Sequence, residues 1–193
     1  MSTIMEVINQ DTLASRVQEL GTEISRDYQG LVPVMVGVMS GSMVFLADLC
    51  RAMSCDLEID FLAINRFAEG GKVRLAFDAS IDLTNRHIVL VEDIVDTGLT
   101  LSAVRALLDA RNPASLATVT LLDKNPRRLV EVPVEYRGFE VGDEFLLGYG
   151  LDWEGAYRNL PSMWAVMDLG EFALDPGMLG RLALGIASDS VES

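Results

Sequence analysis

Three acidic side chains, Glu92, Asp93 and Asp96, crowd a short stretch between an apolar run and a segment with helical spacing. Carboxylates accept hydrogen bonds from a sugar diol, bind Mg2+ directly or through water, or take a proton during a reaction. Gly98 lets the backbone approach a ligand closely, and the start of the helix offers unpaired N–H groups to an anion. Hydroxyl donors follow at Thr97, Thr100 and Ser102. The turn is therefore chemically suited to a phosphomonoester, and the three carboxylates leave each of these other tasks open.

A simpler interpretation is that Asp96 or Thr97 only caps the helix, with Glu92 and Asp93 solvated at the end of a strand. The complete pattern, with a strand before it and a helix after it, favours the ligand site. Lys124, one of two lysines in the chain, also follows an apolar strand. Its ammonium group can donate to a carbonyl oxygen of a ligand, although a solvated loop lysine is the alternative.

The apolar pattern that positions these residues predicts an α/β fold with alternating strands and helices. Helices are expected at 13–28, 43–53 and 99–110, with a further one at 179–186, and strands at 32–38, 57–63, 88–91, 117–122, 132–136, 145–147 and 164–166. The first helix has a candidate cap at Asp11, and a loop is expected at 66–72. The run 88–91 predicts a central parallel strand. In the strand expected at 57–63, Leu57, Ile59 and Phe61 should line the better-buried face.

The composition excludes several classes of protein. A net charge of -14 repels phosphate backbones and anionic membrane surfaces, so neither nucleic acid nor membrane is an expected partner. The apolar stretch 31–49 is interrupted by Pro33 and Gly37, and a cytoplasmic location is expected because no cationic stretch precedes an apolar run at the start. Cys50, Cys55 and His87 are too few for a zinc site, so the cysteines are interpreted as buried reduced thiols and His87 as a turn residue.

Residues 91–102 resemble the phosphoribosyl pyrophosphate signature of the type I phosphoribosyltransferases, specifically their hypoxanthine-guanine branch. The resemblance covers roughly residues 32–166. It implies a central, mostly parallel sheet flanked by helices, a small hood of short strands and a C-terminal extension, with a transferase domain at 1–169 and a tail at 170–193. It also implies a purine salvage enzyme that converts hypoxanthine or guanine and phosphoribosyl pyrophosphate to the nucleoside monophosphate, with Mg2+ as cofactor. A homo-oligomer, dimer or tetramer, is expected.

The family's functional residues map onto this sequence one by one. Those for phosphoribosyl pyrophosphate are Ser40, Gly41, Ser42, Glu92, Asp93, Asp96, Thr97, Gly98, Leu99, Thr100 and Arg158. Those for the purine are Lys124, Phe145, Leu146 and Asp152, and those for the metal are Glu92, Asp93 and Asp152. By this resemblance Asp96 is the general base toward N7 of the purine, and Lys124 donates to the 6-oxo group and favours 6-oxopurines over adenine.

The chain departs from the family pattern at two places. Ser40 stands where the family often carries Lys or Arg, and Arg66-Phe67 replaces the usual Ser-Tyr pair of a loop that is also shorter here. One alternative is therefore a related transferase that acts on another base. Another is a regulator of the same fold that senses phosphoribosyl pyrophosphate and binds RNA, but the acidic composition argues against an RNA-binding face.

Overall fold

The computed structural model describes residues 3–65 and 74–185, and the chain forms two compact units. Ala14–Asp143 make up the first, here called the sheet unit. Met1–Leu13 and Glu144–Ser193 make up the second, here called the terminal unit. The expected loop at 66–72, with the Arg66-Phe67 departure, lies outside the described residues.

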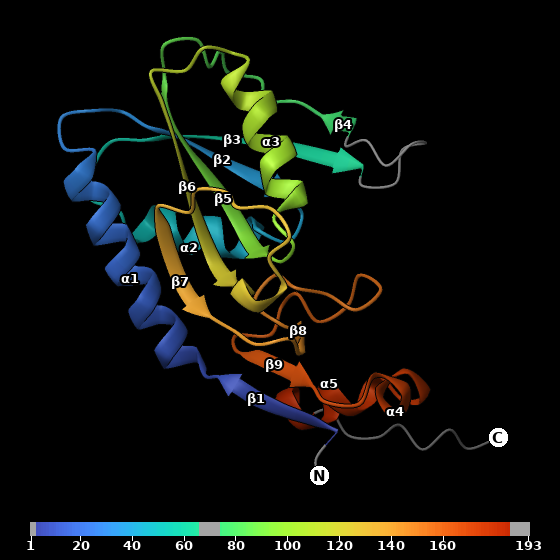
Figure 1. Cartoon of the computed structure of the whole chain (residues 1–193). Coiled ribbons are helices and arrows are strands. Elements are labelled where there is room, and N and C mark those ends of the chain that lie inside the picture. Colours follow the sequence, from blue (N-terminus) through green and yellow to red (C-terminus); the bar gives the residue numbers. More distant parts are fainter. Residues whose placement is uncertain (1–2, 66–73, 186–193) are drawn as a thin grey trace. The chain divides into compact units, whose positions relative to one another are not determined.

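The sheet unit is built on a six-stranded sheet (Figure 1). Its strands, in spatial order, are β4 (Arg74–Phe77), β3 (Glu58–Asn65), β2 (Val34–Met39), β5 (His87–Val95), β6 (Ser115–Asp123) and β7 (Tyr136–Glu140). Its helices are α1 (Gln10–Asp27, whose first residues belong to the terminal unit), α2 (Met43–Ala52), α3 (Leu99–Asp109) and the short 3-10 helix η1 (Asn125–Arg127). Only β4 runs antiparallel to its neighbour, so the expected mostly parallel sheet is confirmed, with β5 inside it.

Helices cover both faces of the sheet, which is why the central strands are continuously apolar. On one face, Val36 of β2 and Leu90 of β5 pack in one cluster with Val104 of α3. On the other face, Gly37 approaches Leu46 of α2, and Figure 1 shows α2 and α3 on opposite sides of the strands. The chain therefore crosses the sheet in the same direction several times, and the carboxyl ends of β2, β5 and β6 meet at one edge.

The buried face of β3 is opposite to the one predicted. Ile59 is 45% exposed, whereas Asp60 and Leu62 are buried. The Asp60 carboxylate accepts hydrogen bonds from the backbone N–H groups of Ser80 and Ile81, both at 2.7 Å, and from Phe61 at 2.8 Å. Burial alone would raise the pKa of Asp60, but these hydrogen bonds outweigh it and lower the pKa below its ordinary value. Because these hydrogen bonds compensate for burial, a carboxylate can occupy the core on the face of β3 that the apolar pattern predicted to be less buried.

Several element boundaries also differ from the prediction. The strand expected at 132–136 lies at Tyr136–Glu140, because Pro133 has no N–H to give to a sheet ladder. The cap of the first helix is Asn9, whose side chain accepts from the Thr12 N–H at 2.9 Å, and not Asp11. The strands β1 (Ile4–Ile8) and β4 were not predicted.

The terminal unit contains a three-stranded antiparallel sheet in the order β1, β9 (Met163–Val166) and β8 (Phe145–Leu147). Two short helices follow, α4 (Leu169–Leu174) and α5 (Gly177–Leu184). Phe172 of α4 and Leu179 of α5 are fully buried against this sheet's core. The hood of short strands is thus present, and the tail docks with a helix close to the expected range. The domain boundary at 169/170 stays a prediction.

Three smaller expectations can be compared with the described residues. Both Cys50 and Cys55 are free and half-buried. His87 opens β5, where its Nδ1 lies 2.8 Å from the Ser115 hydroxyl. Across residues 3–65 and 74–185, no helix has the length and hydropathy required to cross a membrane.

Candidate active site

The three predicted carboxylates lie at the carboxyl end of β5. Glu92 and Asp93 lie near the end of the strand, and Asp96 is the first residue after it. Glu92 is buried beside Thr120 of β6, and Asp93 accepts a hydrogen bond from the Ile94 N–H at 2.7 Å. The sequence prediction placed all three in one turn; the structure has two on the strand and one beyond it. All three residues thus lie at or just beyond the end of one central strand, which suits a binding site.

The start of α3 has the open backbone that an anion site requires. Gly98 precedes the helix with φ 83°, a left-handed conformation that favours glycine, and no side chain caps it. A Cβ at Gly98 would lie 2.4 Å from the Val130 carbonyl oxygen, so the position also requires a small residue. The Thr97 hydroxyl is 3.4 Å from the Leu99 N–H. The backbone N–H groups at the start of α3, and the positive end of the helix dipole, lie at the same edge of the sheet as the three carboxylates.

The turn after β2 contacts the acidic strand end directly. A Cβ added to Gly41 would lie only 1.6 Å from Asp93 Oδ2, so this carboxylate packs against the Gly41 backbone. Ser42 is fully buried, and its hydroxyl donates to the Val38 carbonyl oxygen at 2.7 Å. Ser40 is exposed, and its peptide bond to Met39 is cis. Of the predicted Ser40–Gly41–Ser42 loop, the Ser42 side chain is therefore structural, whereas Ser40 is exposed to a ligand.

Lys124 lies where β6 ends, next to β5. Its N–H donates to the Val95 carbonyl oxygen at 2.9 Å, which fixes its backbone to the end of the acidic strand. The residue is buried, and its Nζ makes a long hydrogen bond of 3.5 Å to the Asp143 carbonyl oxygen. A buried lysine retains strong donor capacity for a ligand oxygen. The sheet unit therefore brings Lys124, Asp93 and Asp96 to one edge, as predicted.

Arginines around this edge are absent from the sequence-based site. Arg127 of η1 contacts Asp96 Oδ1 through Nε at 2.9 Å and Asp143 Oδ1 through Nη1 at 2.9 Å. Arg128 and Arg137 both bind the buried Asp123, the last residue of β6. Asp123 could have been identified from the sequence, because it follows an apolar strand as Glu92 and Asp93 do. Arg127 gave no signal, because Asp96 is distant from it in the sequence, whereas Arg128 follows Asp123 by only five residues.

The remaining predicted residues belong to the terminal unit. Phe145, in β8, meets the ring of Trp153 edge-on, with the ring centroids 5.6 Å apart. Leu146 is buried and pairs with Ala165 of β9. These two residues therefore form part of a rigid strand, and Phe145 is only partly buried.

Asp152 and Arg158, which the resemblance assigns to metal and pyrophosphate, form an ion pair with each other at 2.8 Å. Asp152 also accepts from the Gly155 N–H at 2.7 Å, and Arg158 Nη1 donates to the Gly150 carbonyl oxygen at 2.6 Å. Non-glycine residues with positive φ are concentrated in this segment: Tyr149, Glu154 and Tyr157. Such conformations are costly and cluster where a loop serves a ligand.

The carboxylates suit a magnesium ion that a substrate helps to bind. Mg2+ is usually bound by one or two carboxylates together with substrate phosphates and waters. Glu92 and Asp93 supply two such groups at one strand end. In the part of the chain that the structure describes, no three potential metal ligands are grouped together, so the protein alone does not form a complete cage. The donor set therefore fits an ion shared with a phosphorylated ligand, and the three metal ligands stay a prediction.

Comparisons with known proteins show the family to which this chain is related. The family model for the phosphoribosyl transferase domain matches residues 6–154. The hypoxanthine phosphoribosyltransferase of Salmonella typhimurium is 41% identical over 175 residues, covering 88% of this chain and 98% of the relative. The hypoxanthine-guanine phosphoribosyltransferase of Streptococcus pneumoniae is 36% identical over 159 residues, covering 80% of this chain and 88% of the relative.

A solved structure has the same fold. The crystal structure of a hypoxanthine-guanine phosphoribosyltransferase from Bacillus anthracis is 39% identical, covers 84% of this chain and 98% of its own, and superposes with a TM-score of 0.81. The residues that the family model matches include the acidic end of β5. The chain belongs to the phosphoribosyltransferase family, in the branch of the hypoxanthine-guanine phosphoribosyltransferases.

Proposed function

We propose that this enzyme transfers the phosphoribosyl group of phosphoribosyl pyrophosphate to N9 of hypoxanthine or guanine, releasing pyrophosphate. The observation that carries the proposal is the end of β5, where the acids of a central strand lead directly into the uncapped start of α3. Carboxylates at that point suit a ribose diol, and open N–H groups suit its 5-phosphate. The family and the relatives named above support the same reaction.

Each group of the sheet unit has a separate task in this reaction. Glu92 and Asp93 hold the ribose hydroxyls, and the backbone from Thr97 to Thr100 binds the 5-phosphate. As the bond from C1 to pyrophosphate breaks and N9 bonds to C1, the N7 proton passes to Asp96. Lys124 donates to the 6-oxo group and stabilises the negative charge that collects there. Mg2+, when bound, supplies positive charge to the departing pyrophosphate.

The terminal unit contributes binding groups in this proposal. Phe145 stacks on the purine ring, and Leu146 offers backbone groups to its edge. Base stacking on an aromatic ring contributes about 1 to 3 kcal/mol where it has been measured in nucleic-acid complexes. Arg158 binds pyrophosphate oxygens and Asp152 helps to hold magnesium. Because these two side chains now pair with each other, ligand binding replaces their ion pair with new contacts.

The direct test is turnover of single bases. Purified protein is mixed with Mg2+, phosphoribosyl pyrophosphate and one base at a time, and nucleoside monophosphate is quantified for hypoxanthine, guanine, xanthine and adenine. Product is expected with hypoxanthine or guanine and not with adenine. If no 6-oxopurine gives product, the proposal is wrong. RNA binding at physiological salt without any turnover would favour the regulator instead.

The role of Asp96 has a matched control in the same ion-pair network. Asp96→Asn and Asp143→Asn each remove one carboxylate from Arg127, but only Asp96 is the proposed base. Asp96→Asn should lower kcat by about 100-fold or more, with little change in affinity for phosphoribosyl pyrophosphate. Asp143→Asn should stay near the wild-type rate. Equal rates for the two variants would remove Asp96 from the base role.

Two further expectations remain proposals. A homo-oligomeric state, dimer or tetramer, can be tested by light scattering on the purified chain. A cytoplasmic location can be tested by fractionating cells of the source organism.

A further inference from the structure

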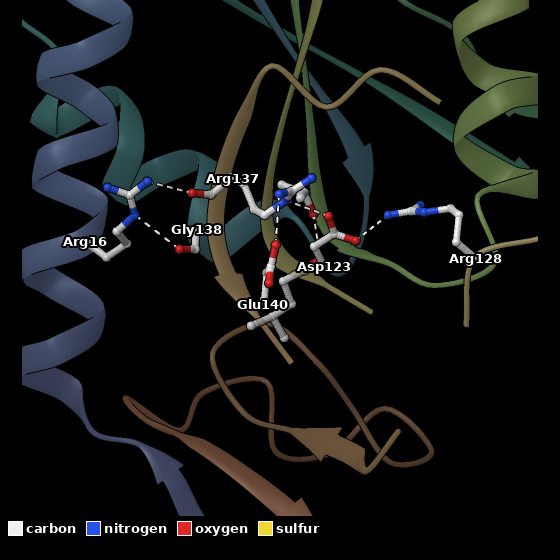
Figure 2. A network of polar contacts seen from close by, with 8 residues as sticks. Arg16, Asp123, Arg128, Arg137, Gly138 and Glu140 are labelled. Atoms are coloured by element: carbon white, nitrogen blue, oxygen red, sulfur yellow. Dashed lines mark hydrogen bonds and ion pairs between the residues drawn. The ribbon is translucent and has the colours of Figure 1, made fainter. Parts of the chain in front are cut away.

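A buried ion pair lies next to the proposed phosphate site. Asp123, at the end of β6, has no exposed surface, and its Oδ1 accepts from Nη2 of Arg128. The Arg128 side chain is itself only 7% exposed. Figure 2 shows Arg128 and Arg137 reaching Asp123 from opposite sides. Two guanidinium groups thus share one buried carboxylate, and they differ in what else they contact.

Arg128 lies against Gly98, within the proposed phosphate site. A Cβ at Gly98 would be 3.1 Å from Arg128 Cδ and 3.4 Å from its Nη1, so the side chain packs on the Gly98 turn. The next two residues bind the same turn, because the N–H groups of Leu129 and Val130 donate to the Thr97 carbonyl oxygen at 2.9 and 3.1 Å. The segment after η1 therefore holds the turn in place through Arg128 and through its backbone.

The second nitrogen of Arg128 has no structural partner. Its Nη1 is buried and makes no hydrogen bond within the part of the chain that the structure describes. An unpaired buried donor is costly, and native structures contain few of them. Arg137 is different: it is 42% exposed and uses Nε on Asp123 at 2.6 Å and Nη1 on Glu140 at 3.0 Å. Stability alone explains the Arg137 contacts, but it does not explain an unpaired Nη1 beside Gly98.

We propose that Arg128 is a positioning residue for the phosphate group at the start of α3, with Asp123 fixing its orientation. Arg128 holds the Gly98 turn open to the anion and places a fixed positive charge beside it. A charge that is already oriented in a dry site acts more strongly than one in water. This need is acute because the three carboxylates of the site oppose an anionic ligand. The inference rests on the proposed function, since the anion is the ribose 5-phosphate.

The chain offers a matched pair of variants. Arg128→Met and Arg137→Met each remove one positive charge from Asp123, but only Arg128 contacts the Gly98 turn. Affinities are measured by calorimetry for phosphoribosyl pyrophosphate and for inosine monophosphate, since both carry a 5-phosphate. Arg128→Met should weaken both by about tenfold, the effect of losing one favourable charge contact. Arg137→Met should bind both ligands as the wild type does.

Comparing KM for the two substrates distinguishes a positioning role from a general loss of structure. Arg128→Met should raise KM for phosphoribosyl pyrophosphate while KM for hypoxanthine stays within about twofold, since neither Arg128 nor Gly98 is proposed to contact the base. If Arg128→Met does not fold, Arg128→Lys keeps the charge but loses the fixed contact. It should still weaken phosphate binding, and wild-type affinity in that variant would overturn the inference.

Failure of this inference differs from failure of the proposed function. If the wild type binds both phosphate ligands and Arg128→Met binds them equally well, only the role of Arg128 is wrong. Equal weakening by Arg128→Met and Arg137→Met would also overturn it, because the effect would then come from Asp123. If the wild type binds neither ligand, both the proposed function and this inference are wrong.

Discussion

Gly41→Ala separates the stability of this fold from its activity. The added Cβ would lie 1.6 Å from Asp93 Oδ2 and 2.7 Å from Asp93 Cγ. Ordinary contacts begin at 3.4 Å, so the carboxylate must retreat by roughly 2 Å. Gly41 is not among the residues with positive φ, so the backbone itself accepts alanine. The substitution therefore acts mainly by displacing Asp93.

Displacement should cost little stability and much activity. The Asp93 carboxylate is the end of a flexible side chain, and moving it breaks its hydrogen bond from the Ile94 N–H, worth about 1 kcal/mol. In a protein of this size that lowers Tm by only about 2 to 4 °C. A shift of about 1 Å in a positioning group can cost about 100-fold in rate, equivalent to about 2.7 kcal/mol. We expect kcat/KM for phosphoribosyl pyrophosphate to fall by about 100-fold.

Gly30→Ala is the control. Gly30 has φ 78°, so alanine there is strained by about 1 kcal/mol, but no atom lies within 4 Å of the added Cβ. Both variants should show similar small losses in Tm by calorimetry, and only Gly41→Ala should lose activity in the nucleotide-forming assay. Wild-type kcat/KM in folded Gly41→Ala would refute the reasoning, because Asp93 would then have no positional role.

Three further outcomes follow from buried polar groups. Asp60→Asn should lower the free energy of unfolding by about 1 to 3 kcal/mol at pH 7 in chemical denaturation, because an amide cannot accept all the donated hydrogen bonds. Since folding lowers the pKa of Asp60, its contribution to the free energy of unfolding is present above about pH 4 and is lost as pH falls through that lowered pKa. An identical pH dependence of stability in the variant would contradict this. Burial first, and then Cys55, raise the pKa of Cys50 to about 11, so iodoacetamide should label Cys50 slowly at pH 8 and faster near pH 11, as read by mass spectrometry. Tyr136→Phe should cost about 1 kcal/mol in the same denaturation assay, because the hydroxyl donates to Asp27 at 3.0 Å; an unchanged midpoint would contradict it.

Local patterns were sufficient to predict the elements that carry the acidic site. The run 88–91 is apolar on both faces because helices cover both sides of β5, and the helix after Gly98 begins at the residue expected. The errors arose where distant partners decide the structure. The buried face of β3 depends on N–H groups twenty residues away, and β1 forms only because β9 pairs with it. No pattern within these short segments contains that information.

The same distinction applies to the site. Glu92, Asp93, Asp96 and Lys124 could be identified because their positions at strand ends follow from local apolar runs. The partner of Asp96 could not, because Arg127 reaches it from a turn that begins after another strand. The roles of the residues in the terminal unit stay predictions that the base panel and the variants test.

An acidic protein can bind a phosphorylated substrate because charge acts locally. At physiological salt, exposed charges are largely screened beyond about 8 Å, so most of the net charge of -14 has little effect on one phosphate. Arg128 lies at the end of β6, where burial and fixed orientation preserve the influence of its charge. Reversing remote surface acids should therefore change the rate of substrate encounter more than the affinity, whereas a single change at Arg128 should alter the affinity itself.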